Sequence, residues 1–110
     1  MWKQSSSLEP VPAPPQRASD AALDELCQRA RAGERAAANR LLAALAPALL
    51  RVARQILGHD SPDVNDATQE AAIGVLRALP GFRSECTLLH FACRIAVLTA
   101  MNARRRRQSE

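Results

Sequence analysis

Apolar residues recur along the chain from residue 19 onward at the spacing of amphipathic helices. The first such pattern predicts a helix that begins at Ser19 or Asp20, either of which can cap it, and that ends at Gly33. Its apolar positions follow the i, i+3, i+4, i+7 spacing of one helix face: Leu23, Leu26, Cys27 and Ala30. We therefore expect the ordered part of the chain to start with a helix.

A longer helix is predicted from Glu34 to Leu57. Its apolar positions again repeat at helical spacing: Ala38, Leu41, Leu42, Leu45, Leu49, Val52, Ala53 and Ile56. Pro47 lies inside this pattern, where it removes one backbone hydrogen bond and clashes with the preceding turn. We therefore expect a kink, or a break into two helices, near Leu45.

A third helix is predicted from Pro62 to about Leu79, with Ser61 as its cap and Pro62 at its first position. The dipeptide Pro80-Gly81 ends it. Its apolar positions are Val64, Ala67, Ala71, Val75, Leu76 and Leu79.

The last helix is expected to open at Cys86 or Thr87, after a loop over residues 82–85, and to continue to about Arg105. At about 100° per residue, one arc about 120° wide collects its apolar side chains. We expect this arc to be the buried face: Leu88, Phe91, Ala92, Ile95, Leu98 and Thr99.

Composition agrees with four helices and one small domain. Among 110 residues, 22 are alanine and three are aromatic, which favours helix over a β-sandwich or barrel. The fold class is therefore predicted to be all-α, a compact bundle of four helices over residues 19–107. Residues 1–18, rich in Pro and Ser, are expected to be disordered, and residues 108–110 to form a short tail.

Charge is distributed unevenly along the chain. The formal net charge of +4 combines +3 over residues 21–57, −3 over residues 58–80 and +4 over residues 81–110. A basic segment, an acidic segment and a second basic segment indicate more than one charged partner surface. Nucleic acid and an acidic protein surface are both plausible partners of a chain whose isoelectric point is about 9.8.

The expected location is the cytoplasm. Three cysteines without a C-x-x-C pair indicate reduced thiols rather than a disulfide framework. Residues 1–18 contain no apolar segment of the kind found in secretory signals. Charged residues interrupt each apolar run, so no membrane insertion is expected.

The chain carries no pattern of nucleophilic or metal-hydrolytic catalysis. It has two histidines and lacks G-x-S-x-G, H-E-x-x-H and a glycine-rich phosphate loop. We therefore predict that it is not an enzyme and expect no cofactor.

Several segments, in order along the chain, resemble motifs of one family. Residues 66–79 match D-x-x-Q-E-x-x-x-x-x-L-R-A-L, a signature in region 2 of bacterial sigma factors. Residues 26–37 resemble the opening of the extracytoplasmic-function group. Residues 82–88 and 94–96 resemble that group's F-R-G-E-S-S-L and R-I-A. The resemblance covers residues 21–107.

The resemblance implies a helical transcription initiation factor. Such a module binds the clamp coiled coil on the largest catalytic subunit of RNA polymerase and recognises the minus-ten promoter element, and an anti-sigma factor is an expected further partner. The polymerase-binding residues implied are Asp66, Gln69, Glu70, Ile73 and Arg77. A carboxylate-bearing first turn suits an arginine-rich helix pair, because charge-assisted hydrogen bonds can surround an apolar centre.

The resemblance also implies that the loop after residue 81 and the start of the last helix read the non-template single strand of promoter DNA. Small polar groups at a helix N-terminus can hold a phosphate or a base edge. For the arginine run at residues 104–107, phosphate contact and a solubilising frayed end are both open. The expected DNA-binding residues are Arg83, Ser84, Glu85, Cys86, Thr87, His90, Arg94, Arg104 and Arg105.

The chain departs from the family pattern at several positions. Phe91 and Cys93 stand where the family has Trp and Tyr, Val97 and Leu98 stand where it has R-N, and Ala72 replaces an aromatic residue. Fewer rings weaken strand opening, since each base stacked on an aromatic side chain contributes about 1–3 kcal/mol. A second hypothesis is therefore a sigma-like interaction module that binds an anti-sigma factor or polymerase without opening DNA.

One cluster lies outside the resemblance. Cys86, His90 and Cys93, at i, i+4 and i+7, form a stripe opposite the expected core and could supply three ligands to zinc or copper. The alternative is that they are ordinary surface residues, which the absence of a C-x-x-C pair favours. We predict no metal site and keep these three as the candidates.

Overall fold

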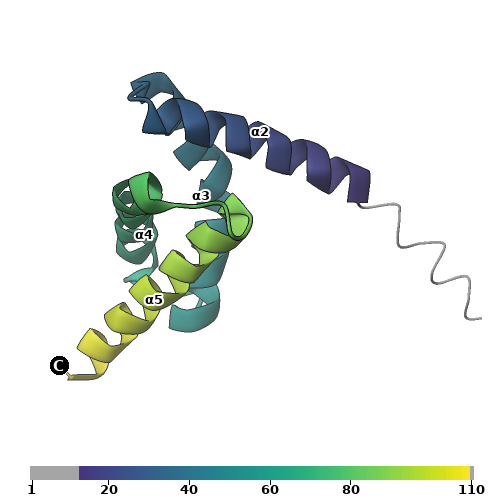
Figure 1. The fold of residues 1–110 in the computed structure, drawn as a ribbon. Helices are drawn as coiled ribbons and strands as arrows, with labels where there is room; N and C mark the ends of the chain where they lie inside the picture. Colours follow the sequence, from purple (N-terminus) through teal and green to yellow (C-terminus); the bar gives the residue numbers. More distant parts are fainter. Residues whose placement is uncertain (1–12, 110) are drawn as a thin grey trace, which may run out of the picture.

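The computed structural model describes the backbone of residues 13–109 and the side chains of residues 21–109. Within these residues the elements are α2 (Ala13–Arg31), α3 (Arg35–Leu57), α4 (Val64–Ala78), a 3-10 turn η1 (Leu79–Gly81) and α5 (Leu88–Ser109). Helices α3, α4 and α5 pack on one another, and α2 lies across one end of them (Figure 1). The predicted all-α bundle of four helices is confirmed.

Both ends of the helical region reach further than predicted. Helix α2 begins at Ala13, and Pro14 and Pro15 fall in its first turn, where a missing N–H breaks no helical hydrogen bond. Residues 13–18, for which disorder was expected, have a helical backbone, and residues 1–12 of the same expected segment lie outside the described residues. Helix α5 continues to Ser109, whose hydroxyl donates to the carbonyl oxygen of Arg105 at 3.1 Å, so residues 108 and 109 are not a separate tail.

Helix α3 is continuous through Pro47. Of the two expected alternatives, a kink or a break into two helices, the break is wrong, because buried Leu45, Ala48 and Leu49 on both sides of the proline hold the helix against its neighbours. The helix ends at Gly58, whose φ of 97° is readily accessible only to glycine and whose N–H donates to the carbonyl oxygen of Arg54 at 2.8 Å.

The connection from α3 to α4 is a short turn. The Ser61 hydroxyl accepts a hydrogen bond from the backbone N–H of Asp63 at 3.2 Å, and the helix begins at Val64, two residues after the predicted start. Ser61 therefore caps the turn, while Asp63 occupies the N-cap position of α4 without a side-chain cap hydrogen bond.

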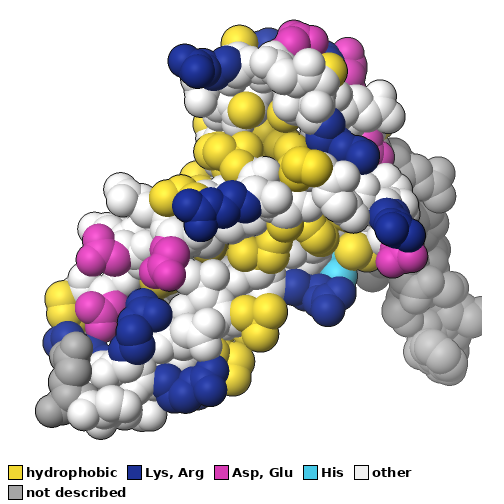
Figure 2. Space-filling view, turned by 60° about the vertical axis from the view of Figure 1, so that its left-hand side comes forward, with side chains coloured by type: hydrophobic (Ala, Val, Ile, Leu, Met, Phe, Trp, Pro, Cys, Tyr) yellow, Lys and Arg dark blue, Asp and Glu magenta, His cyan; other side chains and the backbone are white. Residues whose placement is uncertain are grey.

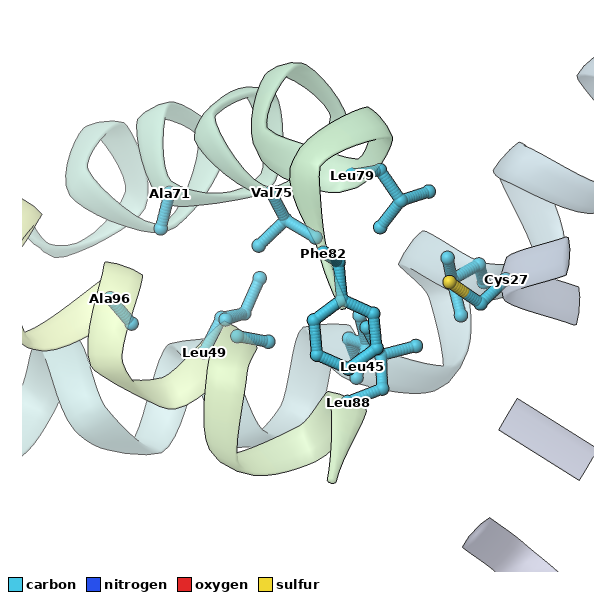
Figure 3. Close-up of a cluster of buried hydrophobic side chains, with 11 residues drawn as sticks. Cys27, Leu45, Leu49, Ala71, Val75, Leu79, Phe82, Leu88 and Ala96 are labelled. Atoms are coloured by element: carbon cyan, nitrogen blue, oxygen red, sulfur yellow. The ribbon is translucent and has the colours of Figure 1, made fainter. Parts of the chain in front are cut away.

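The core lies where the helices meet (Figure 3). Leucines from α3 occupy its centre, and α4 and α5 contribute mostly small residues to it. Cys27 from α2 lies at one end of this cluster (Figure 3). The buried members are Cys27, Leu41, Leu45, Leu49, Ala71, Val75, Leu79, Phe82, Leu88, Ala92 and Ala96.

The buried face of α5 differs from the predicted arc. Leu98, assigned to the core, is 61% exposed, and Thr99 is half-buried. The helix instead buries Leu88, Ala92, Ala96, Ala100 and Ala103. Alanines let α5 approach α3 and α4 closely, and a Cβ added to Gly74 of α4 would lie 3.1 Å from Ile95. The predicted face was centred on the large apolar residues, whereas the structure buries the row of small alanines on the same helix.

One helix in the described part of the chain, α3, is long and apolar enough to cross a membrane by length and composition. The core helix of a soluble protein passes the same test. Helix α3 packs against α2, α4 and α5 and buries Leu41, Leu45 and Leu49 completely, which is the position of a core helix.

Candidate functional site

The five residues predicted to bind polymerase lie on one exposed side of α4. At about 100° per residue they fall within an arc about 100° wide, which we call the α4 outer face: Asp66, Gln69, Glu70, Ile73 and Arg77. The buried residues of α4 lie on its other side. Ile73, near the middle of this face, is 50% exposed. The helical period therefore brings charged groups together around one apolar side chain.

The first turns of α4 also contact the end of α5. Nη2 of Arg106 lies 3.6 Å from Oε1 of Glu70, and Nε of Arg107 lies 3.5 Å from Oδ2 of Asp63. These groups and Asp66 surround a hollow of about 110 Å³, and Figure 2 shows acidic side chains beside arginines near this end of the molecule. Sequence reasoning missed the pairing. The opposed charges of residues 58–80 and 81–110 were the signal for it.

The loop between η1 and α5 is held at both ends. The buried Phe82 donates its backbone N–H to the carbonyl oxygen of Leu79 at 3.0 Å. The Thr87 hydroxyl accepts from the backbone N–H of His90 at 3.1 Å, which caps α5 and confirms Thr87 as one of its two predicted openings. Between them, Ser84 has a φ of 61°, a left-handed conformation that favours glycine.

A hollow of about 350 Å³ opens beside this loop. Four of the predicted DNA-binding residues line it, namely Arg83, Glu85, Cys86 and Arg94, together with Gly81, Phe82 and Phe91. The two phenyl rings stand 4.7 Å apart between centroids and are tilted by 44°. Phe82 is buried, whereas Phe91, which was assigned to the buried face of α5, is half-buried and reaches the hollow. The hollow combines two guanidinium groups with one accessible ring.

A comparison with protein families shows to which family the chain belongs. The family model described as Sigma-70 region 2 matches residues 41–110, which is more than half of the chain. The chain belongs to the sigma-70 region 2 family. Domains of this family bind RNA polymerase and take part in promoter recognition, and they are transcription-factor domains rather than enzymes. No curated protein and no solved structure matches the chain.

The remaining predicted DNA-binding residues of this sigma domain lie outside the loop hollow. Ser84 and Thr87 belong to the same loop but do not line it, and His90 lines a neighbouring groove. Arg104 and Arg105 lie ten or more residues along α5, about 15 Å or further from Arg94 at 1.5 Å per residue. Nη2 of Arg105 donates to Oδ1 of Asn102 at 2.6 Å. The structure therefore separates the predicted DNA-binding set into two groups.

The three cysteines of the sigma domain are free thiols in different surroundings. Cys27 is buried in the core, and burial raises the pKa of its thiol, with a smaller opposing effect from Arg31. Cys86 and Cys93 are half-buried, and Cys86 packs against the core. Over residues 21–109 no group of three or more His, Cys, Asp or Glu side chains is arranged to hold a metal ion, so Cys86, His90 and Cys93 do not form a site there.

Proposed function

We propose that this domain belongs to the extracytoplasmic-function group and acts in the cytoplasm as a transcription initiation factor. In this proposal the α4 outer face docks on the clamp coiled coil of the largest catalytic subunit of RNA polymerase. The loop hollow takes up a base of the non-template strand of the minus-ten element. The observation that carries the proposal is that the five predicted polymerase-binding residues of α4 lie on one exposed helix face within the family match.

The chemistry of the α4 outer face suits an arginine-rich helix pair. Asp66 and Glu70 present carboxylates one turn apart, and charge-assisted hydrogen bonds to guanidinium groups are stronger than neutral ones. Ile73, half exposed beside them, supplies an apolar centre that a partner helix can cover. Gln69 adds an amide that both donates and accepts.

The internal ion pair of Glu70 is compatible with docking. Arg106 and Glu70 are both more than half exposed, and ion pairs between exposed side chains contribute about 0.2–1 kcal/mol. A polymerase arginine that makes a better-aligned contact can therefore replace Arg106 at small cost. The released Arg106 is then available for the phosphates of nearby DNA.

The loop hollow suits a single unstacked base. Its volume of about 350 Å³ lies in the range of small-molecule sites, about 300–1,000 Å³. Arg83 and Arg94 offer planar guanidinium groups, which stack on bases and donate to phosphates or base edges. Glu85 can accept from an exocyclic amine. The N-terminus of α5 at Thr87 adds the positive end of a helix dipole.

A double substitution tests docking. Asp66→Ala with Glu70→Ala should weaken binding to a polymerase clamp fragment at least tenfold, because hydrogen bonds to charged groups contribute about 1.5–3 kcal/mol each. The matched control is Asp24→Ala with Glu25→Ala, which removes the same charge from exposed positions on α2. Equal affinities for the two double variants would refute docking through the α4 outer face.

A second candidate function is a sigma-like module that binds an anti-sigma factor or polymerase without opening DNA. It is favoured by the single accessible ring at the hollow, Phe91, in a chain that has Cys93 rather than an aromatic residue two positions later. This module should bind the clamp fragment and be indifferent to changes at Arg83. A domain that reads promoter DNA should lose affinity for the single strand when Arg83 is changed.

A further inference from the structure

Helix α5 carries exposed and half-buried apolar side chains away from its buried alanines. Four of them follow one another at helical spacing, and we call them the α5 apolar stripe: Cys93, Val97, Leu98 and Met101. Leu98 is 61% exposed and Met101 is 39% exposed. The first three line an open groove of about 330 Å³ together with His90 and Arg94. Exposed apolar side chains gathered in a groove mark interaction sites more often than ordinary surface.

The charged side chains of helix α5 itself have one sign. Helix α5 contains five arginines and no acidic residue. Arg106 and Arg107 lie near carboxylates of α4 and its N-cap, whereas Arg94 lines the groove itself. Arg104 and Arg105 are exposed and lie three and four residues after Met101, the last residue of the stripe. Positive charge therefore flanks the apolar side chains along the helix.

This charge pattern selects among the possible occupants. A second copy of the chain would bring the arginines of one α5 against those of the other, because the helix carries no carboxylate to receive them. Nucleic acid would satisfy the arginines, but the stripe offers it aliphatic and sulfur-containing side chains instead of rings to stack. A protein helix with apolar side chains at i, i+3 or i+4 and i+7 and carboxylates beside them satisfies both features.

We propose that the α5 apolar stripe is a docking surface for an acidic amphipathic helix of a protein partner. The proposal rests on the four stripe residues, which lie outside the α4 outer face and the loop hollow; of the groove residues beside them, Arg94 also lines the hollow. It therefore stands or falls separately from polymerase docking and base capture.

The probe is a fluorescently labelled synthetic peptide helix with leucines at helical spacing and glutamates on both flanks, titrated with the full chain. The control peptide has lysines in place of the glutamates. The glutamate peptide should bind, and the lysine peptide should not. Leu98→Asn should weaken binding about tenfold. The matched control Leu89→Asn changes an exposed leucine half a turn around the same helix and should leave the affinity unchanged.

A second variant tests the charge. Arg104→Gln with Arg105→Gln should weaken binding of the glutamate peptide and reduce its dependence on salt, because two of the flanking charges are gone. Circular dichroism checks that each variant is folded. Leu98 is largely exposed, so its substitution should leave the melting temperature nearly unchanged.

Other results would overturn the proposal. No binding of the glutamate peptide to the wild-type chain would do so, as would equal losses for Leu98→Asn and Leu89→Asn. A loss of single-stranded DNA binding as large as the loss of peptide binding in Leu98→Asn would assign the face to nucleic acid. Self-association of the wild-type chain that Leu98→Asn abolishes would assign it to a second copy.

Discussion

The α4 outer face and the loop hollow lie on the same core but are constructed differently. The α4 outer face is a regular helix surface, whose side chains are collected by the helical period alone. The loop hollow combines η1, an irregular loop and α5, and it depends on a buried phenyl ring, a left-handed serine and a threonine cap. The arrangement of side chains on the α4 outer face therefore needs only an intact helix. The arrangement in the loop hollow depends on several separate contacts.

The largest expected effect comes from the core that supports both regions. Leu88, fully buried at the start of α5, anchors the loop to the helix bundle. Leu88→Ala should lower the free energy of unfolding by about 2–5 kcal/mol, because it leaves a cavity in a packed core. Its neighbour Leu89 is 38% exposed, and Leu89→Ala should cost less than about 1 kcal/mol. Urea denaturation measures both, and similar losses would contradict the assigned α5 face.

A change at Arg83 separates the two regions functionally. Arg83→Ala should weaken binding of a single-stranded minus-ten oligonucleotide about tenfold, since it removes a charged donor worth about 1.5 kcal/mol from the hollow. Affinity for the clamp fragment should not change. His90→Ala should have a smaller effect, because His90 lies outside the hollow. Fluorescence anisotropy titrations measure these affinities. The charge control is Arg35→Ala, which removes an exposed arginine of α3. An unchanged affinity for the oligonucleotide in Arg83→Ala would favour the second candidate function.

Replacing Ser84, which has a left-handed backbone conformation, by glycine should stabilise the domain. A non-glycine residue in the left-handed region costs about 1–2 kcal/mol, and glycine in exchange loses about 0.5–1 kcal/mol more entropy on folding. Ser84→Gly should therefore raise the free energy of unfolding by up to about 1 kcal/mol. Ser84→Ala cannot relieve the strain and should give no gain. Thermal melting of both variants checks this, and equal stabilities would mean that the loop is unstrained.

The smallest expected effect concerns the ion pair that links α5 to the α4 outer face. Arg106→Gln removes the partner of Glu70 and should change the free energy of unfolding by no more than about 0.5 kcal/mol. It should raise affinity for the clamp fragment by up to about twofold, because Glu70 no longer has an internal partner. Arg104→Gln removes the same charge without removing that partner and should not raise the affinity. A decrease in affinity with Arg106→Gln would indicate that the pair orients Glu70 for docking.

The parts that sequence predicted follow regular periodicity. Four helices, the buried leucines of α3 and the shared side of Asp66 and Glu70 all follow from apolar spacing. The buried face of α5 was not predicted correctly. Alanines such as Ala96 and Ala100 are less hydrophobic than Leu98, so the apolar pattern favoured the side of the helix that carries Leu98. The contact between α4 and α5 was also missed. The opposed charges of residues 58–80 and 81–110 indicated an attraction, but no local pattern places Arg106 beside Glu70.

The loop hollow was predicted only in part, for a related reason. The resemblance implied its residues, but the sequence could not indicate which of them surround a common space. Arg83 and Arg94 line the hollow from positions eleven residues apart, while Ser84, adjacent to Arg83, does not. Which side chains meet in an irregular loop depends on backbone angles set by long-range packing, here the burial of Phe82.

Site-specific crosslinking in the polymerase complex tests the central claim most directly. A photoreactive residue in place of Gln69, exposed on the α4 outer face, is compared with one in place of Gln55, exposed on α3. Docking through α4 predicts that the Gln69 position crosslinks to the clamp coiled coil of the largest catalytic subunit and that the Gln55 position does not. Crosslinking from Gln55 alone, or from neither position in an assembled complex, would contradict it.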